Sequence, residues 1–267
     1  MAEEPVKPIL RVDGLTIGFD GTIIQKDISF EVKAGSIFAI MGGSGSGKST
    51  LLRALIGLLR PTAGAIHVGD EDYWGVSEDR RAQIDRGFGV LFQGGALWSS
   101  MTVAENVGLP LRMLSPLDEA SIKTLARLKL RLVGLESAGD DMPAELSGGM
   151  RKRAGLARAL ALDPAILMLD EPSSGLDPIS SKRLDDLIRE LRDGFGMTVI
   201  LVSHELASLL DICDDGIFLD AETKTAIAHG SPRRLADACD NPVVHAFMHR
   251  DGQAADRPAP GGQNAAR

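Results

Sequence analysis

The chain has 267 residues, of which 44% are hydrophobic and 25% are charged, a balance typical of a soluble globular protein. This composition excludes a wholly disordered or collagen-like chain. The 29 Lys and Arg residues against 37 Asp and Glu residues give a net charge of −8. That sign is wrong for a protein whose main task is to coat nucleic acid, so we expect no nucleic-acid partner.

The start of the chain and its cysteines indicate a protein of the cytosol. The first residues, MAEEPVKPIL, carry two acids and two prolines where a secretory signal needs a basic region and an apolar run. Cys213 and Cys239 form no CxxC pair or Cys/His cluster, which favours reduced thiols. The uncharged stretch between Arg86 and Glu105 has spanning length, but its Gly, Ser, Gln and Thr residues are too polar for hydrocarbon. We therefore expect no direct membrane span, and any membrane role must come through a partner.

The order of the expected elements predicts an α/β fold. Residues 10–17 and 28–32 alternate in polarity between glycines, which predicts a small antiparallel sheet. Other apolar runs lack polar alternation and are typical of strands buried on both faces of a largely parallel sheet. These runs span residues 36–41, 89–92, 166–169 and 198–202. Helical spacing covers residues 48–59, much of 117–162, and 180–192.

The strongest single motif is GGSGSGKST, which lies between a predicted strand and a predicted helix and fits the phosphate-loop pattern GxxxxGK(S/T). Its glycines let successive N–H groups face the phosphates, and the following helix presents its positive end to the same anions. Lys48 is expected to reach the β and γ phosphates, and the Ser49 hydroxyl to hold Mg²⁺. The pattern arises by chance in only about one per cent of chains this long, so a plain flexible turn is the weaker interpretation. The candidate nucleotide-binding residues here are Gly42, Gly43, Ser44, Gly45, Ser46, Gly47, Lys48, Ser49 and Thr50.

Two acids follow the apolar run at residues 166–169. Asp170, at the end of a strand beside the phosphate loop, is placed to orient Mg²⁺ through water, and Glu171 is placed to polarise the attacking water as a general base. A solvated strand end is the alternative when the acids are considered alone. Together with the phosphate loop, the acids favour nucleotide hydrolysis.

A second anion-binding candidate is LSGGM, at residues 146–150, which comes immediately before a basic helical stretch. Ser147, Gly148 and Gly149 offer a hydroxyl and bare amides to an anion at the start of a helix. A simple helix cap with a loop is the alternative interpretation.

The order and spacing of these motifs resemble those of the ATP-binding cassette (ABC) ATPases, from about residue 9 to residue 230. By that resemblance, residues 42–50 match the Walker A loop, 146–150 the signature, 166–171 Walker B, and 173–177 (SSGLD) the D-loop. The resemblance implies that Gln93 is the Q-loop glutamine, which contacts Mg²⁺ and water, and that His204 contacts the γ phosphate. It also implies that Asp177 of the D-loop belongs to the nucleotide site. ATP and Mg²⁺ are the implied ligands.

Positions 19 and 150 differ in how closely they follow the family pattern. Phe19 stands where the family usually stacks an aromatic ring on adenine, although an ordinary core phenylalanine is the alternative. Met150 replaces the glutamine with which the commonest family signature ends. This change removes one polar group but leaves the serine and both glycines, so we do not expect it to abolish ATP binding.

The resemblance implies a RecA-like P-loop core with an antiparallel β subdomain and an inserted α-helical subdomain. The expected boundaries are 1–95 and 160–230 for the core with its β subdomain, and 96–159 for the helical subdomain. A C-terminal helical extension is expected at 231–250. The last stretch, 251–267, is rich in Ala, Gly and Pro without an aliphatic anchor, which predicts a disordered tail.

The resemblance also implies a head-to-tail homodimer, in which each ATP lies between the Walker A loop of one copy and the signature of the other. Hydrolysis then removes the ligand that bridges the two copies. Residues 94–107 place Leu97 and Trp98 in a loop, where we expect a groove for a coupling helix of a membrane subunit. We expect Val103 and Val107 to be buried core residues instead.

The amino-acid sequence of residues 91–112 and 142–164 is similar to that of one branch of the family, the Mla/Mkl-type phospholipid-transport ATPases. This similarity implies a subunit on the cytoplasmic side of the inner membrane of a Gram-negative envelope, powering phospholipid transport between membranes. The implied partners are an MlaE-like permease, an MlaB-like STAS protein and, indirectly, a periplasmic MCE lipid-binding protein. In that branch the C-terminal tail can clasp the neighbouring copy, but residues 251–267 show no match to it.

Other classes fit less well. A DNA-repair-type ABC ATPase needs a long coiled-coil insertion, and a translation-associated ABC protein carries two cassettes in one chain. A nucleotide kinase has no reason to contain LSGGM, SSGLD and the switch histidine together. An amino-acid or other solute importer stays open, because the ATPase subunit never touches the cargo.

Overall fold

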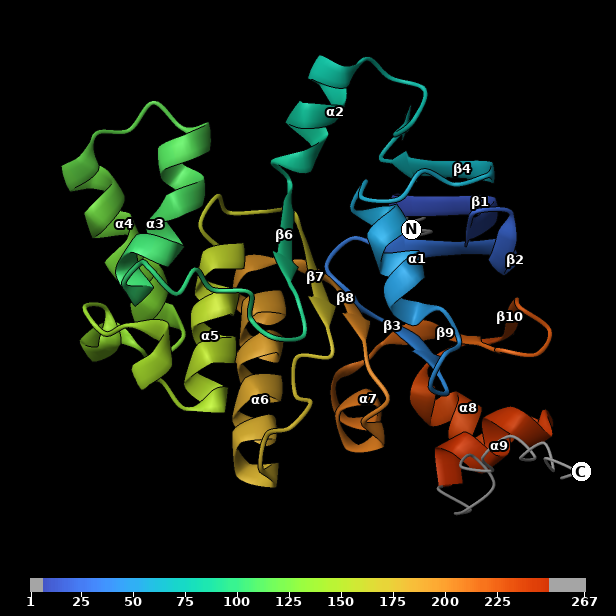
Figure 1. Ribbon diagram of the computed structural model, residues 1–267. Helices are drawn as coiled ribbons and strands as arrows, with labels where there is room; N and C mark the ends of the chain where they lie inside the picture. Colours follow the sequence, from blue (N-terminus) through green and yellow to red (C-terminus); the bar gives the residue numbers. More distant parts are fainter. Residues whose placement is uncertain (1–6, 250–267) are drawn as a thin grey trace, which may run out of the picture.

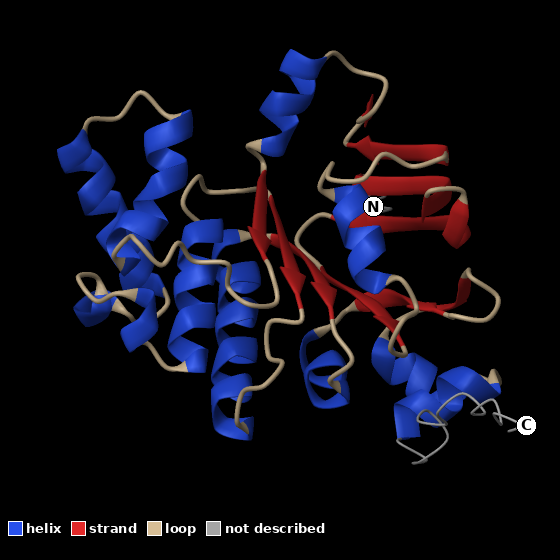
Figure 2. Cartoon of the chain, in the orientation of Figure 1, coloured by secondary structure: helices blue, strands red, loops and turns tan. Residues whose placement is uncertain are grey.

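The computed structural model describes residues 7–249 of the chain. Two sheets form its centre, and helices flank them (Figures 1 and 2). The larger sheet has six strands in the order β10-β9-β3-β8-β7-β6, and the smaller has four in the order β2-β1-β4-β5. The predicted tail at 251–267 lies outside the described residues.

The six-stranded sheet contains the four strands expected from uninterrupted apolar runs. These are β3 (Ile37–Gly42), β6 (Phe88–Leu91), β7 (Ile166–Asp170) and β8 (Thr198–Val202), all of which pair in parallel. Side chains of β3 alternate between two hydrophobic clusters, with Ala39 and Met41 in one and Phe38 and Ile40 in the other. Both faces of the sheet are therefore covered, which explains the lack of polar alternation.

Two strands of this sheet were not predicted. β9 (Asp215–Leu219) pairs in parallel with β3, and β10 (Ala226–His229) pairs antiparallel with β9. Gly216 interrupts the apolar run of β9. A Cβ at this position would lie 2.5 Å from the carbonyl oxygen of Ala39, so the close approach of β9 to β3 requires glycine.

The small antiparallel sheet at the start of the chain is confirmed. β1 (Pro8–Phe19) pairs antiparallel with both β2 (Thr22–Lys33) and β4 (Ala63–Val68), and β5 (Glu71–Asp72) extends the sheet from β4. The inward side chains of β1 and β2 share a hydrophobic cluster with Leu51 and Leu55. This sheet therefore packs against the helix that follows the phosphate loop.

The helices agree with the expected ones except at their ends and for α2, α3 and α7, which were not predicted as helices. The α-helices are α1 (Lys48–Leu55), α2 (Glu78–Asp85), α3 (Val103–Leu114), α4 (Glu119–Leu132), α5 (Gly148–Ala159), α6 (Pro178–Phe195), α7 (Leu206–Ile212), α8 (Pro232–Ala238) and α9 (Pro242–His249). Two short 3-10 helices, η1 (Glu136–Ala138) and η2 (Pro143–Glu145), precede α5. α1 is shorter than predicted because Gly57, with φ of 76°, lies against Tyr73, where a Cβ would be 1.9 Å from the hydroxyl oxygen.

Helix α3 was not predicted as an element. A capping box of Thr102 and Glu105 begins it, and this pattern was visible in the sequence. Gly108 and Pro110 inside the helix obscured the helical spacing. Val103 and Val107 are fully buried, as expected.

The helices α3, α4 and α5 gather on one side of the six-stranded sheet, while α8 and α9 lie near its β9–β10 edge (Figure 1). These groups fall within the ranges 96–159 and 231–250, and the division of the chain into those units stays a prediction. Among residues 7–249, none of the helices combines the length and the apolar character that a membrane crossing requires.

The contact between α6 and α7 includes a buried acid whose protonation affects stability. Asp185 is buried, and its Oδ2 accepts a hydrogen bond from the Ser208 hydroxyl at 2.8 Å. Burial raises the pKa of Asp185 to about 6, and the hydrogen bond from Ser208 opposes this shift. Because the pKa is higher in the folded chain than in the unfolded one, this group favours folding at acidic pH. Its contribution is complete below about pH 4 and is lost as the pH rises through about 6.

We therefore expect Asp185→Asn, which keeps the acceptor for Ser208, to raise the free energy of unfolding at pH 7.5 by about 1–2 kcal/mol. The same substitution should have little effect at pH 4.5. Thermal denaturation of both proteins across this range measures the difference. Asp186→Asn is the control, because Asp186 is only partly buried and its pKa is lowered by a hydrogen bond from Lys182. Identical pH profiles for Asp185→Asn and the unmodified chain would contradict this account.

Candidate functional site

The phosphate loop connects the end of β3 to the start of α1, and its shape requires glycine. Gly42 has a φ of 143° and Gly47 has a φ of 82°. A Cβ on Gly42 would lie 2.3 Å from the carbonyl oxygen of Leu219, and one on Gly47 would lie 2.8 Å from Ile24. The loop is thus packed against β2 and β9, and side chains at these two positions would push it away.

Gln25 is hydrogen-bonded to the phosphate loop, a role that was not predicted from the sequence. It is fully buried in β2, and its Nε2 donates to the carbonyl of Ser46 at 2.8 Å and to that of Asp220 at 2.9 Å. Gln25 is out of phase with the buried Ile28, Phe30 and Val32, because the pairing of β2 with β1 shifts register between Ile28 and Gln25, so the alternation of the strand gave no signal for it. Gln25 therefore ties together the phosphate loop and the end of β9.

Lys48 is folded over the loop that precedes it. Its Nζ donates to the carbonyls of Gly42 at 2.9 Å and Gly43 at 2.8 Å, and the side chain is buried. Burial lowers the pKa of Lys48, and the nearby charges of Glu171 and Asp170 oppose this shift. The Lys48 amine is thus a cation held at the loop by two backbone carbonyls.

Ser46 presents a free polar atom in the same loop. Its Oγ is buried and has no hydrogen-bond partner among residues 7–249. A buried hydroxyl without a partner costs free energy unless a ligand or water satisfies it. With the bare loop amides and the Lys48 amine, this hydroxyl fits the oxygen-rich phosphates of a nucleotide.

Ser49 and Asp170 are brought together from segments far apart in the sequence. The Ser49 hydroxyl donates to Asp170 Oδ1 at 3.0 Å. Burial raises the pKa of Asp170, while the hydrogen bond from Ser49 and the charges of Arg53 and Lys48 oppose that shift. A hydroxyl and a carboxylate are hard oxygen donors of the kind that Mg²⁺ prefers.

Glu171 and His204 form a close pair at the carboxyl ends of β7 and β8. His204 Nδ1 lies 2.7 Å from Glu171 Oε1. Glu171 is buried, and its Oε2 has no hydrogen-bond partner in the part of the chain that the structure describes. The backbone of Glu171 is left-handed, with φ of 51°, and its N–H donates to the carbonyl of Val202 at 2.9 Å. One carboxylate oxygen is therefore paired with histidine, and the other is buried without a partner.

The signature segment forms the exposed start of α5. Ser147 is the N-cap, and its hydroxyl accepts from the Met150 N–H at 3.3 Å. Ser147 and Gly148 are exposed, so the first amides of the helix face outward. Within residues 7–249, no hydrogen bond joins residues 147–149 to the phosphate loop, so the chain does not bring these two candidate anion sites into contact.

The other predicted residues lie at separate places around the site. Asp177 caps α6, and its Oδ1 accepts from the N–H groups of Ile179 and Ser180 at 3.0 Å. Gln93 is exposed in the loop after β6. Phe19, at the end of β1, is 45% exposed, which makes the core alternative for this residue wrong. The nucleotide contacts of these three residues stay predictions.

Arg158 attaches the loop after Gln93 to α5, a contact that the sequence did not reveal. Its guanidinium donates to the carbonyls of Ala96 at 2.7 Å and Gly95 at 2.9 Å. On the same helix, a Cβ on Gly155 would lie 3.0 Å from the Gly95 carbonyl oxygen. The loop and the helix are thus in direct backbone contact.

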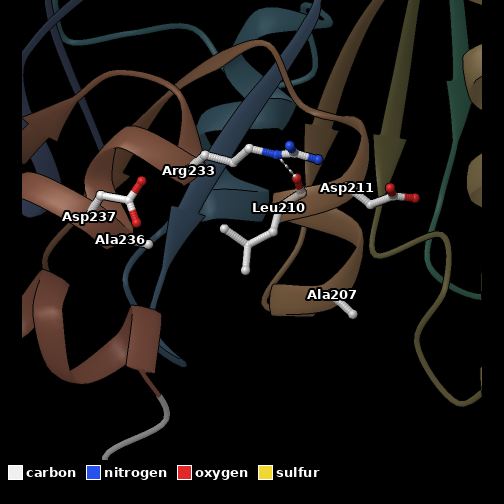
Figure 3. A pocket seen from close by; sticks show the side chains of 6 residues that line it. All are labelled: Ala207, Leu210, Asp211, Arg233, Ala236 and Asp237. Carbon is white, nitrogen blue, oxygen red and sulfur yellow. Dashed lines mark hydrogen bonds between the residues drawn. The ribbon is translucent and has the colours of Figure 1, made fainter.

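A separate pocket of about 560 Å³ lies between α7 and α8 (Figure 3). Arg233 Nε donates to the carbonyl of Leu210 at 2.6 Å, as the dashed line in Figure 3 shows. The pocket is lined by Ala207, Leu210, Asp211, Arg233, Ala236 and Asp237. None of the predicted site residues lines it, so it is distinct from the candidate nucleotide site.

Comparison with known proteins identifies the fold and the family. The model of the ABC transporter family matches residues 25–174. A solved structure of cbiO1 from Clostridium perfringens, part of the ABC transporter complex cbiONQ, has a TM-score of 0.78 and 29% identity, covering 87% of this chain and 92% of that chain. The ATP-binding cassette MJ0796, in a dimeric post-hydrolysis state bound to ADP and Pi, has a TM-score of 0.74 and 28% identity, covering 82% and 97%. The predicted ABC fold is confirmed.

Two relatives share more of the sequence. The MlaF protein of Escherichia coli (strain K12), an intermembrane phospholipid transport system ATP-binding protein, is 42% identical over 237 residues, covering 89% of this chain and 86% of the relative. The mkl protein of Mycobacterium leprae, a probable ribonucleotide transport ATP-binding protein, is 40% identical over 245 residues, covering 92% and 70%. Because the family model matches residues 25–174 and the relatives match over most of the chain, the chain belongs to the ABC transporter family and is an ATP-binding cassette ATPase.

Proposed function

We propose that this chain is the ATPase subunit of an Mla-type transporter, which uses ATP hydrolysis to move phospholipid between the membranes of a Gram-negative envelope. The pairing of Glu171 with His204, which leaves one buried carboxylate oxygen free, is the observation that carries the hydrolytic part. The similarity to MlaF supports the cargo. The proposed location is the cytoplasmic side of the inner membrane, peripheral to a permease.

ATP binding is assigned to the phosphate loop, residues 42–50. The Lys48 amine leaves the Gly42 and Gly43 carbonyls to contact the β and γ phosphates, while loop amides and the Ser46 hydroxyl donate to the phosphate oxygens. Phe19 stacks on the adenine ring, which its exposure permits.

Mg²⁺ fits the oxygen donors at the end of β7. Ser49 would hold the ion directly, Asp170 would orient it through water, and Gln93 would complete the set from its loop. When bound, Mg²⁺ neutralises developing charge on the phosphates.

The hydrolytic step is assigned to Glu171 and His204. Glu171 accepts a proton from the attacking water through Oε2, which has no other partner among the described residues. His204 holds the other carboxylate oxygen and contacts the γ phosphate. The general base is thereby fixed before the substrate arrives.

Two copies complete the site. Ser147 and Gly148 are exposed, and with Gly149 they bind the γ phosphate held by the partner copy, while Asp177 contributes from the D-loop. The dimeric state of MJ0796 supports this homodimer. Loss of the γ phosphate on hydrolysis then separates the two halves.

The proposed membrane partner is an MlaE-like permease. An MlaB-like STAS protein and, indirectly, a periplasmic MCE lipid-binding protein are the other proposed partners. Trp98 is 59% exposed in the loop between β6 and α3, and its backbone N–H donates to Asn106 Oδ1 at 2.7 Å, so the backbone of the loop is held while the indole stays accessible. Leu97, the preceding residue, is partly buried against the larger hydrophobic cluster, and its exposed part is assigned with Trp98 to the surface proposed for the coupling helix.

We expect Trp98→Glu to lower transport by about 10-fold or more while ATP binding stays within about 2-fold, because a charge in an apolar docking surface is costly to bury. Leu97→Glu should act in the same way. Transport in reconstituted vesicles and nucleotide affinity are measured in parallel. Leu128→Glu, at an exposed apolar position on α4, is the control. Unchanged transport in both variants of the loop would count against the docking surface.

The cargo is tested by affinity purification of the chain with its partners from native membranes. The expected result is an MlaE-like permease with copurifying phospholipid and an MCE-domain protein. Copurification of a soluble solute-binding protein without these components would favour an amino-acid or other solute importer. Uptake of ribonucleotide by the purified complex would favour the cargo named for the mycobacterial relative.

A further inference from the structure

Helix α5 carries a buried lysine that reaches across to the loop after β7. Lys152 is 7% exposed, and its Nζ donates to the carbonyl of Glu171 at 3.0 Å. The same amine donates to the Ser174 hydroxyl oxygen at 3.0 Å and to the Ser174 carbonyl. An ammonium group has three N–H donors, so these contacts use all of them.

Lys152 is held by hydrogen bonds to this loop and not by an ion pair. Burial lowers the pKa of Lys152, whereas the charges of Glu205 and Glu171 raise it. No ion pair within 4.0 Å involves Lys152 in the described range 7–249. Its acceptors are two backbone carbonyls and a hydroxyl, so its position depends on the conformation of the loop.

The carbonyl that Lys152 holds belongs to Glu171, the residue whose own carboxylate pairs with His204. Glu171 adopts a left-handed backbone, which costs about 1–2 kcal/mol for a residue with a Cβ. Its N–H is fixed by the Val202 carbonyl on β8, and its carbonyl also accepts from the Ser174 hydroxyl at 3.0 Å. The unfavourable conformation is thus held from both sides of the residue.

We propose that Lys152 is a positioning residue for ATP hydrolysis, which holds the Glu171 peptide so that the carboxylate stays paired with His204 and directed at the attacking water. This inference rests on the general-base role proposed for Glu171. Lys152 acts only through Glu171 and does not touch the nucleotide.

Arg153, the next residue on α5, offers a matched control. Its Nη1 donates to the carbonyls of Val133 at 3.0 Å and Gly134 at 3.3 Å, so it also is a cation bound to two backbone carbonyls. Those carbonyls follow α4 and lie outside the candidate site. A general effect of losing a cation from α5 should therefore appear in Arg153→Met as well.

The test compares Lys152→Met with Arg153→Met in the full chain, purified with its permease. Lys152→Met should lower kcat for ATP hydrolysis by about 10–100-fold and change KM by less than about 3-fold, because a misplacement of about 1 Å is enough for such a loss. Arg153→Met should stay within about 3-fold in kcat. Lys152→Arg, which keeps the charge and several donors, should recover most of the loss. Equal losses in the two Met variants, or a rise in KM alone, would overturn the proposal.

A second comparison uses the Glu171→Gln background under single-turnover conditions. If Lys152 acts through Glu171, adding Lys152→Met there should lower the residual rate by less than about 2-fold. A further loss as large as in the unmodified chain would overturn the inference. Normal turnover in Glu171→Gln alone would instead reject the general-base role, so the two failures are distinguishable.

If Lys152→Met does not fold, Ser174→Ala tests the positioning role of Lys152 instead. It removes the hydroxyl that both accepts from Lys152 and donates to the Glu171 carbonyl. We expect kcat to fall by about 3–10-fold with KM nearly unchanged, because one N–H donor of Lys152 is left without its acceptor. An unchanged kcat in Ser174→Ala would contradict the proposed network.

Discussion

Glu171→Gln is expected to lower ATP turnover by about 100–10,000-fold while leaving ATP affinity within about 3-fold. The amide keeps the size of the side chain and an acceptor for His204, but it cannot accept the proton of the attacking water. The loss therefore falls on the chemical step. Phosphate release under steady-state conditions and binding of a fluorescent ATP analogue measure the two quantities.

The same variant tests the dimer. Because ATP binds but is not cleaved, Glu171→Gln should accumulate as an ATP-dependent dimer, which light scattering after size-exclusion chromatography detects. Glu190→Gln, at an exposed acid on α6, makes the same change of charge away from the site and should behave like the unmodified chain. Turnover at the normal rate in Glu171→Gln, or a monomer at saturating MgATP even beside the permease, would overturn the proposed mechanism.

Lys48→Met is expected to weaken MgATP binding by about 30–1,000-fold, because it removes a charge-assisted contact to the phosphates. The substitution also leaves the Gly42 and Gly43 carbonyls without the donors that they have in this structure. Titration of the fluorescent ATP analogue measures the affinity directly. Hydrolysis should fall in parallel at ATP concentrations below saturation.

The control for this substitution is Lys33→Met, which removes an exposed lysine at the end of β2. Its ATP affinity should match that of the unmodified chain, and both Met variants should show the same fold by circular dichroism. If Lys48→Met bound MgATP normally, the amine would have no role in phosphate binding.

The sequence predicted the elements whose signal is local. The buried strands at 166–170 and 198–202 are apolar runs in the sequence because their side chains pack into hydrophobic clusters on both faces of the sheet. β9 and α3 were missed because glycine or proline interrupts their patterns for reasons of packing. Gly216 is needed where β9 approaches β3, and this reason is visible only once the two strands are side by side.

In the site, too, the sequence predicted individual residues but not the contacts between distant segments. Motifs predicted Glu171 and His204 separately, but their 2.7 Å pairing depends on β7 and β8 being neighbours in the sheet. Gln25, Lys152 and Arg158 escaped notice because each acts on the backbone of a distant loop. Residue type and spacing carry no information about such contacts, so only the folded arrangement reveals them.

Helix α5 sends three cationic side chains to three different segments. Lys152 binds the loop at 171–174, Arg153 the end of α4, and Arg158 the loop at 95–96. A helix moves as a rigid rod, so a tilt or rotation that starts at its exposed first turn displaces all three anchors in one event. A movement of α5 is therefore felt at the loop after β7, at the end of α4 and at the loop after β6 together, and a change confined to one of these segments meets resistance from the other two.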